Sequence, residues 1–396
     1  MSVEVQVSAK TTPEDRLLAP HGGVLIDRFV PAQSRDRLWV QATDLPKLGL
    51  LRRELADLLL IAEGALSPLH GFQDSAQVET ILEQGRLPTG LAWTIPITLQ
   101  AKGISVGPGS EVALVDEDGH LRGVMQVEER FRLDLERVAT RVYGTTDPEH
   151  PGVKVLRTED PVRLAGKVQV FAGVGSVDPY RLSPEQTRAE LNRRGFTEVA
   201  AFQTRNPLHR SHEYLLRIAL EVSDGLLLHP LVGETKAGDI PAEVRMECYR
   251  VLVDHYLPKE RVLLATLDTA MRYAGPAEAI HHAILRQNYG ASRLIVGRDH
   301  AGVGKYYGPF DAHVRFDRYE PSALAIRPLK VDVTFWCKAC GGTASTKSCA
   351  HDASQRVELS GTEVRRRLEA GEALPAEFSR PEVAEVLGRY YRSIRS

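Results

Sequence analysis

The residues most able to do chemistry gather in one ten-residue stretch, residues 203–212. This stretch offers amide, hydroxyl, guanidinium and imidazole donors and contains no carboxylate, so we expect it to bind a strongly anionic ligand. A lone arginine or histidine on a surface loop is usually only solvated, whereas here six such side chains fall together. The candidate donors are Gln203, Thr204, Arg205, Asn206, His209 and His212.

A strand and a helix are expected to position this loop. Residues 199–202 are apolar and strand-like, and apolar side chains recur over residues 211–221 with the spacing of one helix face. Pro207 prevents the strand from continuing. Such strand–loop–helix units present ligand groups at the carboxyl end of a strand, where the N–H groups at the helix start favour an anion.

A second cluster follows another short apolar run, residues 293–296, and reads G-R-D-H-A-G at residues 297–302. Glycine-rich turns after a strand place backbone N–H groups against phosphate or nucleotide. The glycines are spaced as in a P-loop, but Val303 stands where that motif requires lysine, so we expect no kinase domain. The candidate nucleotide-binding residues are Gly297, Arg298, Asp299, His300 and Ala301.

A further loop, residues 229–239, reads H-P-L-V-G-E-T-K-A-G-D. Lys236 would supply a point charge for a phosphate, and Gly233 and Gly238 would allow close approach of the backbone. Taken alone, this segment could equally be an ordinary surface loop.

Together these motifs are similar to those of the ATP sulfurylase (sulfate adenylyltransferase) family. The strongest are the segments at 203–212 and 297–302, with weaker matches at 229–239, 67–72 (S-P-L-H-G-F) and 360–368 (S-G-T-E-V-R-R-R-L). The H-x-x-H portion alone also resembles the H-x-G-H pattern of other nucleotidyltransferases, so another adenylyl- or cytidylyltransferase is one alternative. A non-catalytic nucleotide- or anion-binding protein is the other, and it would have lost part of the donor set.

The resemblance implies reversible transfer of an adenylyl group from ATP to sulfate, by in-line attack of sulfate on the α-phosphate. The products would be adenosine 5′-phosphosulfate and pyrophosphate. It implies that Gln203, Arg205 and the backbone of Ala301 hold sulfate. Thr204, Arg205 and Asn206 would stabilise the transition state.

The resemblance also assigns the remaining motif residues to the nucleotide. His209 and His212 would bind the phosphates and the leaving pyrophosphate, and residues 297–300 would seat the adenosine. Mg²⁺ would arrive with the ATP phosphates. A metal-binding role for the two histidines is the competing interpretation, but their loop contains no acidic residue to complete such a site.

A separate cluster of metal ligands lies near the C-terminus, where Cys337-x2-Cys340 is followed by Cys349-x-His351. Zinc binds Cys₃His sets tetrahedrally, and a closed four-ligand site is structural rather than catalytic. The second pair is more tightly spaced than in usual zinc fingers, and reduced thiols in a loop are the alternative. Some bacterial and archaeal ATP sulfurylases resemble this chain in carrying such a cluster, so we expect a structural Zn²⁺.

The sequence predicts three domains, at residues 1–170, 171–327 and 328–396. In the first, short β-type segments at 93–99 and 111–115 accompany helices at 45–62, 75–84 and 135–143. The resemblance implies that this β-rich domain is a PUA-like barrel.

The second domain alternates helices with short apolar strands, which favours a Rossmann-like, doubly wound parallel sheet. The third is a small C-terminal domain that holds the cysteine cluster. The elements predicted for the second domain are strands at 199–202, 225–231, 261–267 and 293–296 and helices from 183, at 242–256 and at 276–289.

Composition excludes several classes of function. A net charge of −2 gives no basic field for nucleic acid, and no apolar run approaches the roughly 20 residues that span a bilayer. Three of only four cysteines fall within thirteen residues, which does not suit an extracellular disulfide framework. We therefore expect a cytoplasmic protein whose partners are small molecules. A homodimer is a separate expectation, which the composition does not determine.

Overall fold

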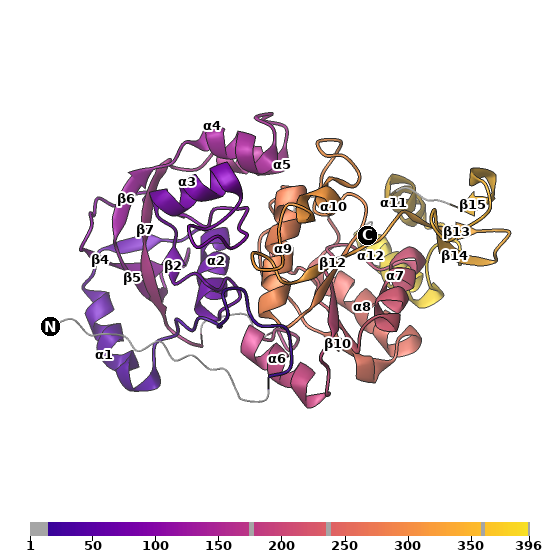
Figure 1. Ribbon diagram of the computed structural model, residues 1–396, viewed down its shortest axis with the longest axis horizontal. Coiled ribbons are helices and arrows are strands. Elements are labelled where there is room, and N and C mark those ends of the chain that lie inside the picture. Colours follow the sequence, from indigo (N-terminus) through magenta and orange to yellow (C-terminus); the bar gives the residue numbers. More distant parts are fainter. Residues whose placement is uncertain (1–14, 174–177, 235–238, 358–360, 395–396) are drawn as a thin grey trace.

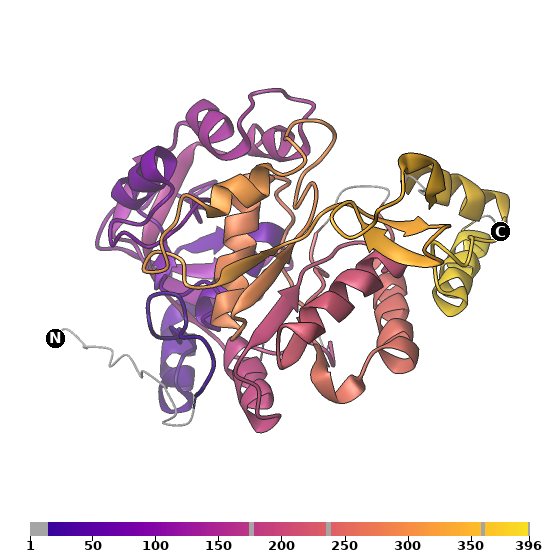
Figure 2. The ribbon, with the colours of Figure 1, turned by 45° about the vertical axis from the view of Figure 1, so that its right-hand side comes forward.

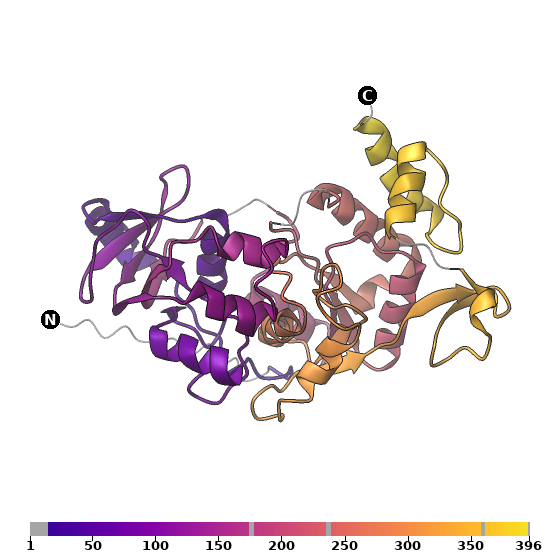
Figure 3. The ribbon, with the colours of Figure 1, turned by 90° about the horizontal axis from the view of Figure 1, so that it is seen from above.

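The computed structural model describes residues 15–173, 178–234, 239–357 and 361–394. A β-rich N-terminal part, a central α/β part and a C-terminal part follow one another along the molecule's long axis (Figure 1, Figure 3). Two residues of the sequence motifs, Lys236 and Ser360, lie outside the described residues, as does Gly238. None of the helices in the described ranges has the length and apolar character needed to cross a membrane.

The N-terminal part is built on a seven-stranded sheet in which β1, β4, β5, β7 and β2 are neighbours in that order. β3 and β6 also pair with β7, and only β1 and β4 run parallel to each other. The strands are β1 (Lys47–Gly49), β2 (Gly71–Phe72), β3 (Leu99–Gln100), β4 (Glu111–Val115), β5 (Leu121–Gln126), β6 (Glu129–Arg132) and β7 (Val162–Val170). The helices are α1 (Ala32–Thr43), α2 (Arg52–Ala62), α3 (Ser75–Gln84), α4 (Leu135–Val138), which continues as a π-helical turn to Tyr143, and α5 (Pro151–Leu156).

Two predicted elements of this part are wrong in extent. The helix predicted at 45–62 begins only at Arg52, because residues 47–49 pair with β4 instead. The strand predicted at 93–99 forms only at its last residue. Pro96 has no N–H for a ladder, and Thr94 donates its hydroxyl hydrogen bond to the carbonyl of Ala277 across the domain boundary.

The central part carries a five-stranded sheet in the order β10–β9–β8–β11–β12, with every pair parallel. Its strands are β8 (Val199–Phe202), β9 (Gly225–Leu228), β10 (Val262–Leu264), β11 (Arg293–Val296) and β12 (Arg327–Lys330). The helices are α6 (Pro184–Arg193), α7 (Arg210–Glu221), α8 (Ala242–Tyr256), α9 (Pro276–Asn288) and α10 (Asp311–Phe316), with a 3₁₀ turn at Lys259–Arg261.

Strand order places a switch point at the middle of this sheet. From β8 the chain builds outward through β9 and β10 on one side, then returns to β11 and β12 on the other. In open α/β sheets, ligands bind in the crevice outside the carboxyl ends of the strands at such a point. The predicted loops at 203–209 and 297–302 follow β8 and β11, the two strands that flank it.

Helix α9 joins the central part to the N-terminal part and is buried along its whole length. The Asn288 amide donates to the carbonyls of Ala65 and Ser67, and a buried ion pair links Arg272, just before the helix, to Asp57 at 2.7 Å. Since these groups are buried and hydrogen-bonded to one another, they fix the N-terminal part against the central sheet.

The C-terminal part comprises a small three-stranded sheet and a pair of helices, both on the right of Figure 2. The sheet and the helix pair are separated from each other in Figure 3. The elements are β13 (Thr334–Cys337), β14 (Gly342–Ser345), a 3₁₀ turn at Ala353–Gln355, β15 (Arg356–Val357), α11 (Gly361–Ala370) and α12 (Pro381–Ser393). β12 pairs with β11, so residues 327–330 belong to the central sheet. Apolar side chains of α11 and α12 pack together with Cys248 of α8.

Candidate active site

A cavity of about 250 Å³ opens at the switch point between β8 and β11. It is lined by ten of the eleven candidate residues that the two sequence motifs supply, all except His209. His209 lies in an adjoining cavity of about 350 Å³, which shares Asn206, Ser211 and His212 with the first. The fold therefore brings the two loops to one continuous site.

The first loop is shaped by its own polar groups. The Thr204 hydroxyl donates to the carbonyl of Asn206 and accepts from the Asn206 N–H, both at 3.0 Å. Tyr249 of α8 donates to the same carbonyl at 2.9 Å. Thr204 is 6 % exposed, so its hydroxyl serves the conformation of the loop, while the Asn206 side chain is exposed at the cavity.

Arg205 lines the cavity, and its side chain is 17 % exposed. Its guanidinium sits 5.1 Å from the centre of the Tyr273 ring, a cation–π contact that orients the planar group. The nearest carboxylate is that of Asp239, 3.8 Å away. That distance is too long for a hydrogen bond, so the donors of Arg205 stay available to an oxyanion.

The two loop histidines are held as neutral rings. Burial lowers the pKa of His209 to about 3, with a further contribution from His212, and burial lowers the pKa of His212 to about 4. The backbone N–H of His209 donates to Nδ1 of His212 at 3.2 Å. The ring proton of His212 must therefore sit on Nε2, which makes that atom a hydrogen-bond donor.

The second loop has an unusual backbone at Asp299 and Ala301, whose φ angles are 53° and 56°. Left-handed conformations of this kind cost about 1–3 kcal/mol each and persist where the surroundings enforce them. Here the Asp299 N–H donates to the carbonyl of Pro309, and the Ala301 carbonyl accepts from Gly275. Within the described residues no group accepts from the N–H groups of His300 or Ala301, so both remain available to an anion.

The side chains of the second loop differ in their exposure and in their contacts. Arg298 is exposed and pairs with its neighbour Asp299 at 2.9 Å. His300 points inward: its Nε2 lies 3.3 Å from Nδ1 of His282, whose own Nε2 lies 3.5 Å from Glu278. Burial, followed by the nearby His282, lowers the pKa of His300 to about 3, so this ring is neutral as well.

Two described residues of the loop at 229–239, Gly233 and Asp239, differ in what they contact. A Cβ on Gly233 would lie 2.3 Å from the carbonyl oxygen of Thr269, so this glycine permits the protein's own backbone to pack closely. Asp239 lines the cavity beside His209. Lys236 lies outside the described residues.

Several lining residues were not among the predicted site residues, although Val364, Arg365 and Leu368 belong to the motif at 360–368. They come from the segment leading into β13 and from the C-terminal helices, which are distant in sequence and close in space. The first cavity adds Asp332, Val333 and Thr334, and the second adds Val364, Arg365, Leu368, Phe378, Leu387 and Tyr391. Asp239, Asp299 and Asp332 also give the site carboxylates, which the first loop lacks.

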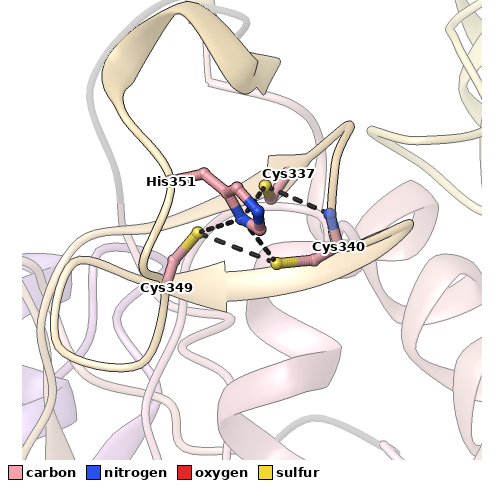
Figure 4. Close-up of side chains that lie close together, drawn as sticks. All are labelled: Cys337, Cys340, Cys349 and His351. Atoms are coloured by element: carbon pink, nitrogen blue, oxygen red, sulfur yellow. Dashed lines mark hydrogen bonds between the residues drawn. The ribbon is translucent and has the colours of Figure 1, made fainter.

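The cysteine cluster forms one compact group at the tip of the β13–β14 hairpin (Figure 4). Gly341, with φ of 64°, makes the turn between the strands. Cys340 and Cys349 place their sulfur atoms 3.8 Å apart, and Nδ1 of His351 lies 3.3 to 3.7 Å from the three sulfurs. Tetrahedral zinc with bonds of about 2.3 Å to sulfur and about 2.0 Å to nitrogen separates its ligands by about 3.5 to 3.8 Å, so these residues fit that ion.

The hairpin also contacts the helix of the first loop. The guanidinium of Arg210 lies 4.8 Å from the centre of the Trp336 ring, and the hydroxyls of Tyr214 and Ser348 are 3.3 Å apart. The segment leading into the hairpin, residues 332–334, lines the cavity. The cysteine cluster is thereby connected to the site through packing.

Known proteins share both the sequence and the fold. Residues 178–390 match the ATP-sulfurylase family and residues 18–173 match the PUA-like domain. A sulfate adenylyltransferase of Symbiobacterium thermophilum is 52 % identical over 374 residues, which cover 93 % of this chain and 95 % of that protein. Another from Chloroflexus aurantiacus is 48 % identical over 376 residues, covering 95 % and 97 %.

A solved structure, a hexameric APS kinase from Thiobacillus denitrificans, has a TM-score of 0.74 and 26 % identity. The match covers 94 % of this chain and 68 % of that one. The similarity therefore runs through the N-terminal, central and C-terminal parts alike. On the strength of the match over residues 178–390 and of these near full-length relatives, the chain belongs to the ATP-sulfurylase family.

Proposed function

We propose that this protein is a sulfate adenylyltransferase, which converts ATP and sulfate reversibly into adenosine 5′-phosphosulfate and pyrophosphate. The observation that carries the proposal is the cavity at the switch point, where the loop after β8 meets the loop after β11. Its first loop supplies anion donors, and its second supplies free backbone N–H groups.

The reaction needs positioning more than acid–base chemistry. Sulfate is fully ionised near pH 7 and has no proton for a base to remove. A sulfate oxygen forms a bond to the α-phosphorus while the bond from that phosphorus to the bridging oxygen of pyrophosphate breaks. The protein must hold two anions together and stabilise the charge that grows on the phosphates, which fixed donors do well.

Residues of both loops would hold sulfate. Arg205 presents a planar fork that can bind two oxyanion oxygens. Its Nε makes no hydrogen bond to the carboxylate of Asp239, 3.8 Å away, which supports this role. Gln203 and the free N–H of Ala301 line the same cavity. Thr204 and Asn206 would act with Arg205 at the transition state, Thr204 through the loop conformation that it stabilises.

The histidines would serve the phosphates as neutral donors. Their lowered pKa values rule out a positive charge at pH 7, so their contribution is a directed Nε2–H hydrogen bond. Residues 297–300 would seat the adenosine beside Val333. Mg²⁺ would enter with ATP as part of the substrate and neutralise phosphate charge.

We also infer that Cys337, Cys340, Cys349 and His351 hold one structural Zn²⁺. The four ligand atoms all lie within 4.8 Å of one another, and none of these residues lines the cavity between the two loops, which suits a structural rather than a catalytic ion. A cytoplasmic location and a homodimeric state complete the proposal. Light scattering of the purified protein measures the oligomeric state.

The direct test is an assay of pyrophosphate release from ATP and Mg²⁺ with and without sulfate, beside ATP formation from adenosine 5′-phosphosulfate and pyrophosphate. We expect both reactions to proceed, and the forward one to require sulfate. Pyrophosphate release that does not depend on sulfate, or that requires a different nucleophile, would contradict the assignment.

A further inference from the structure

A turn near the C-terminus docks on the first turn of α7, at the edge of the proposed site. The backbone N–H of Arg210 donates to the carbonyl of Phe378 at 3.0 Å. The Phe378 ring lies 4.3 Å from the His209 ring, centre to centre. Arg380 closes the contact with two hydrogen bonds of 2.8 Å to the carboxylate of Glu213.

Between these contacts lies Ser379, a residue outside every motif. It is 1 % exposed, and its Oγ lies 3.2 Å from Nδ1 of His209. The other acceptor within reach of the hydroxyl is the carbonyl of Arg380, at 3.5 Å, which is the longer contact. The Ser379 hydroxyl is therefore within donating distance of Nδ1 of His209, and the carbonyl of Arg380 is the competing acceptor.

We propose that Ser379 is a positioning residue, whose hydroxyl donates to Nδ1 of His209 and thereby places the ring proton on Nε2. This role rests on the proposed adenylyl transfer, in which His209 meets phosphate oxygens. His212 is fixed in the same tautomer by the backbone N–H of His209. Both rings are then Nε2–H donors. Ser379 of the C-terminal part fixes the tautomer of His209, and the loop's own backbone fixes that of His212.

The tautomer matters because a neutral imidazole is a donor at one nitrogen and an acceptor at the other. With the proton on Nδ1, His209 would turn a lone pair toward a phosphate oxygen, and the two would repel. A proton fixed on Nε2 before substrate binds needs no reorganisation during the reaction, which is how preorganised donors accelerate charge transfer. Within the described residues no group competes for Nε2 of either ring.

Docking of the turn and control of the tautomer are separable, since Arg380 holds the turn through Glu213 without touching His209. Ser379→Ala removes the donor and keeps the ion pair. Arg380→Met removes the ion pair and keeps the donor. Ser223→Ala is the matched control, because that hydroxyl bonds to the carbonyls of Ala219 in α7 and Gly225 in β9 and does not contact His209.

The experiment combines NMR with kinetics on the full chain. Long-range ¹H–¹⁵N correlation spectra of protein labelled with ¹⁵N-histidine report which ring nitrogen carries the proton. We expect His209 to be the Nε2–H form in the unmodified protein, in Arg380→Met and in Ser223→Ala, and a mixture of tautomers in Ser379→Ala. Loss of one oriented hydrogen bond should lower kcat of Ser379→Ala by about tenfold and change KM for sulfate by less than about twofold.

Two results overturn the proposal separately from the function. One is a His209 ring that carries its proton on Nδ1 in the unmodified, active enzyme, a spectrum that needs no variant to fold. The other is a Ser379→Ala enzyme with an unchanged spectrum and a kcat that falls only as far as in Arg380→Met. If the unmodified protein shows the Nε2–H ring but no sulfate-dependent turnover, the proposed function fails and the positioning role fails with it.

Discussion

The Nε atom of Arg205 and the Oδ2 atom of Asp239 lie 3.8 Å apart, and neither buried atom has a hydrogen-bond partner within the described residues. A buried charge with an unmade hydrogen bond is costly, so such a pair is stable only when something else completes it. The stacking of Arg205 on Tyr273 keeps the guanidinium facing the cavity. An oxyanion bound between the two loops would accept the hydrogen bonds that Arg205 does not donate to Asp239.

The first prediction follows from this arrangement. Arg205→Lys keeps the positive charge but loses the planar fork, and we expect sulfate-dependent kcat/KM to fall by about 100-fold or more. Arg217→Lys, on the exposed side of α7, is the control for a change of arginine to lysine. Turnover of Arg205→Lys near that of the unmodified protein would exclude Arg205 as the sulfate donor.

Replacing either loop histidine should affect turnover more than sulfate binding. In His209→Asn and His212→Asn we expect kcat to fall by about 10- to 100-fold while KM for sulfate stays within about threefold, because both rings would act where charge grows on the phosphates. Steady-state kinetics with sulfate and ATP varied separately provide the measurement. A rise in KM for sulfate at constant kcat would place the histidines in the sulfate pocket instead.

Acid should destabilise the protein through its buried histidines. Burial lowers the pKa of His209 and of His300 to about 3, and that of His212 and of His21 to about 4. The unfolded chain takes up these protons near pH 6.5 and the folded protein does not, so this stability is complete above about pH 6.5. It is lost progressively as the pH falls from about 6.5 toward about 4.

Urea unfolding at pH 7.5, 6.5 and 5.5 measures this loss. The slope of the unfolding free energy against pH gives the number of extra protons that the unfolded chain binds. At pH 5.5 we expect this number to fall by nearly one for each of the four histidines that is replaced by asparagine. Replacement of the exposed His255 is the control. An unchanged slope in His300→Asn would mean that the folded state admits that proton.

Zinc should be bound at about one ion per chain in protein purified without a histidine tag. Cys340→Ser should lose the metal and lower the melting temperature. Because the hairpin packs on Arg210 and its approach lines the cavity, KM for ATP should also rise. Cys248→Ala, which removes a thiol remote from the cluster, should keep both the zinc and its response to chelator. Metal analysis and thermal unfolding with chelator decide the matter, and a chelator without effect would exclude a structural ion.

The buried ion pair between Asp57 and Arg272 should stabilise the packing of the N-terminal part against the central part. Asp57→Ala leaves a buried guanidinium without its partner, which typically costs about 3–5 kcal/mol. Glu320→Ala breaks the more exposed pair with Arg86 and should cost less than about 1 kcal/mol. Equal losses in the two variants, measured by urea unfolding, would show that Arg272 finds another partner.

Much of the catalytic sheet could be predicted from the sequence, because its elements carry strong local signals. Strand β11, helix α8 and the capped start of α6 at Ser183 have the predicted bounds. Strands β9 and β10 are shorter than predicted, because only part of each apolar run forms a ladder. Helix α1, which is poor in apolar residues, had no pattern that would predict it.

The sequence by itself determined the donors of the site, because they lie in two motifs that each follow an apolar strand directly. Such motifs can be found without any knowledge of the tertiary structure. The sequence could not determine that Asp239 faces Arg205, that Tyr273 orients it, or that Ser379 reaches His209. Those contacts join residues far apart in the chain, whose types are common in surface loops. Only the strand order, which sets β8 beside β11, and the docking of the C-terminal part on α7 bring them together, since packing rather than local sequence selects such neighbours.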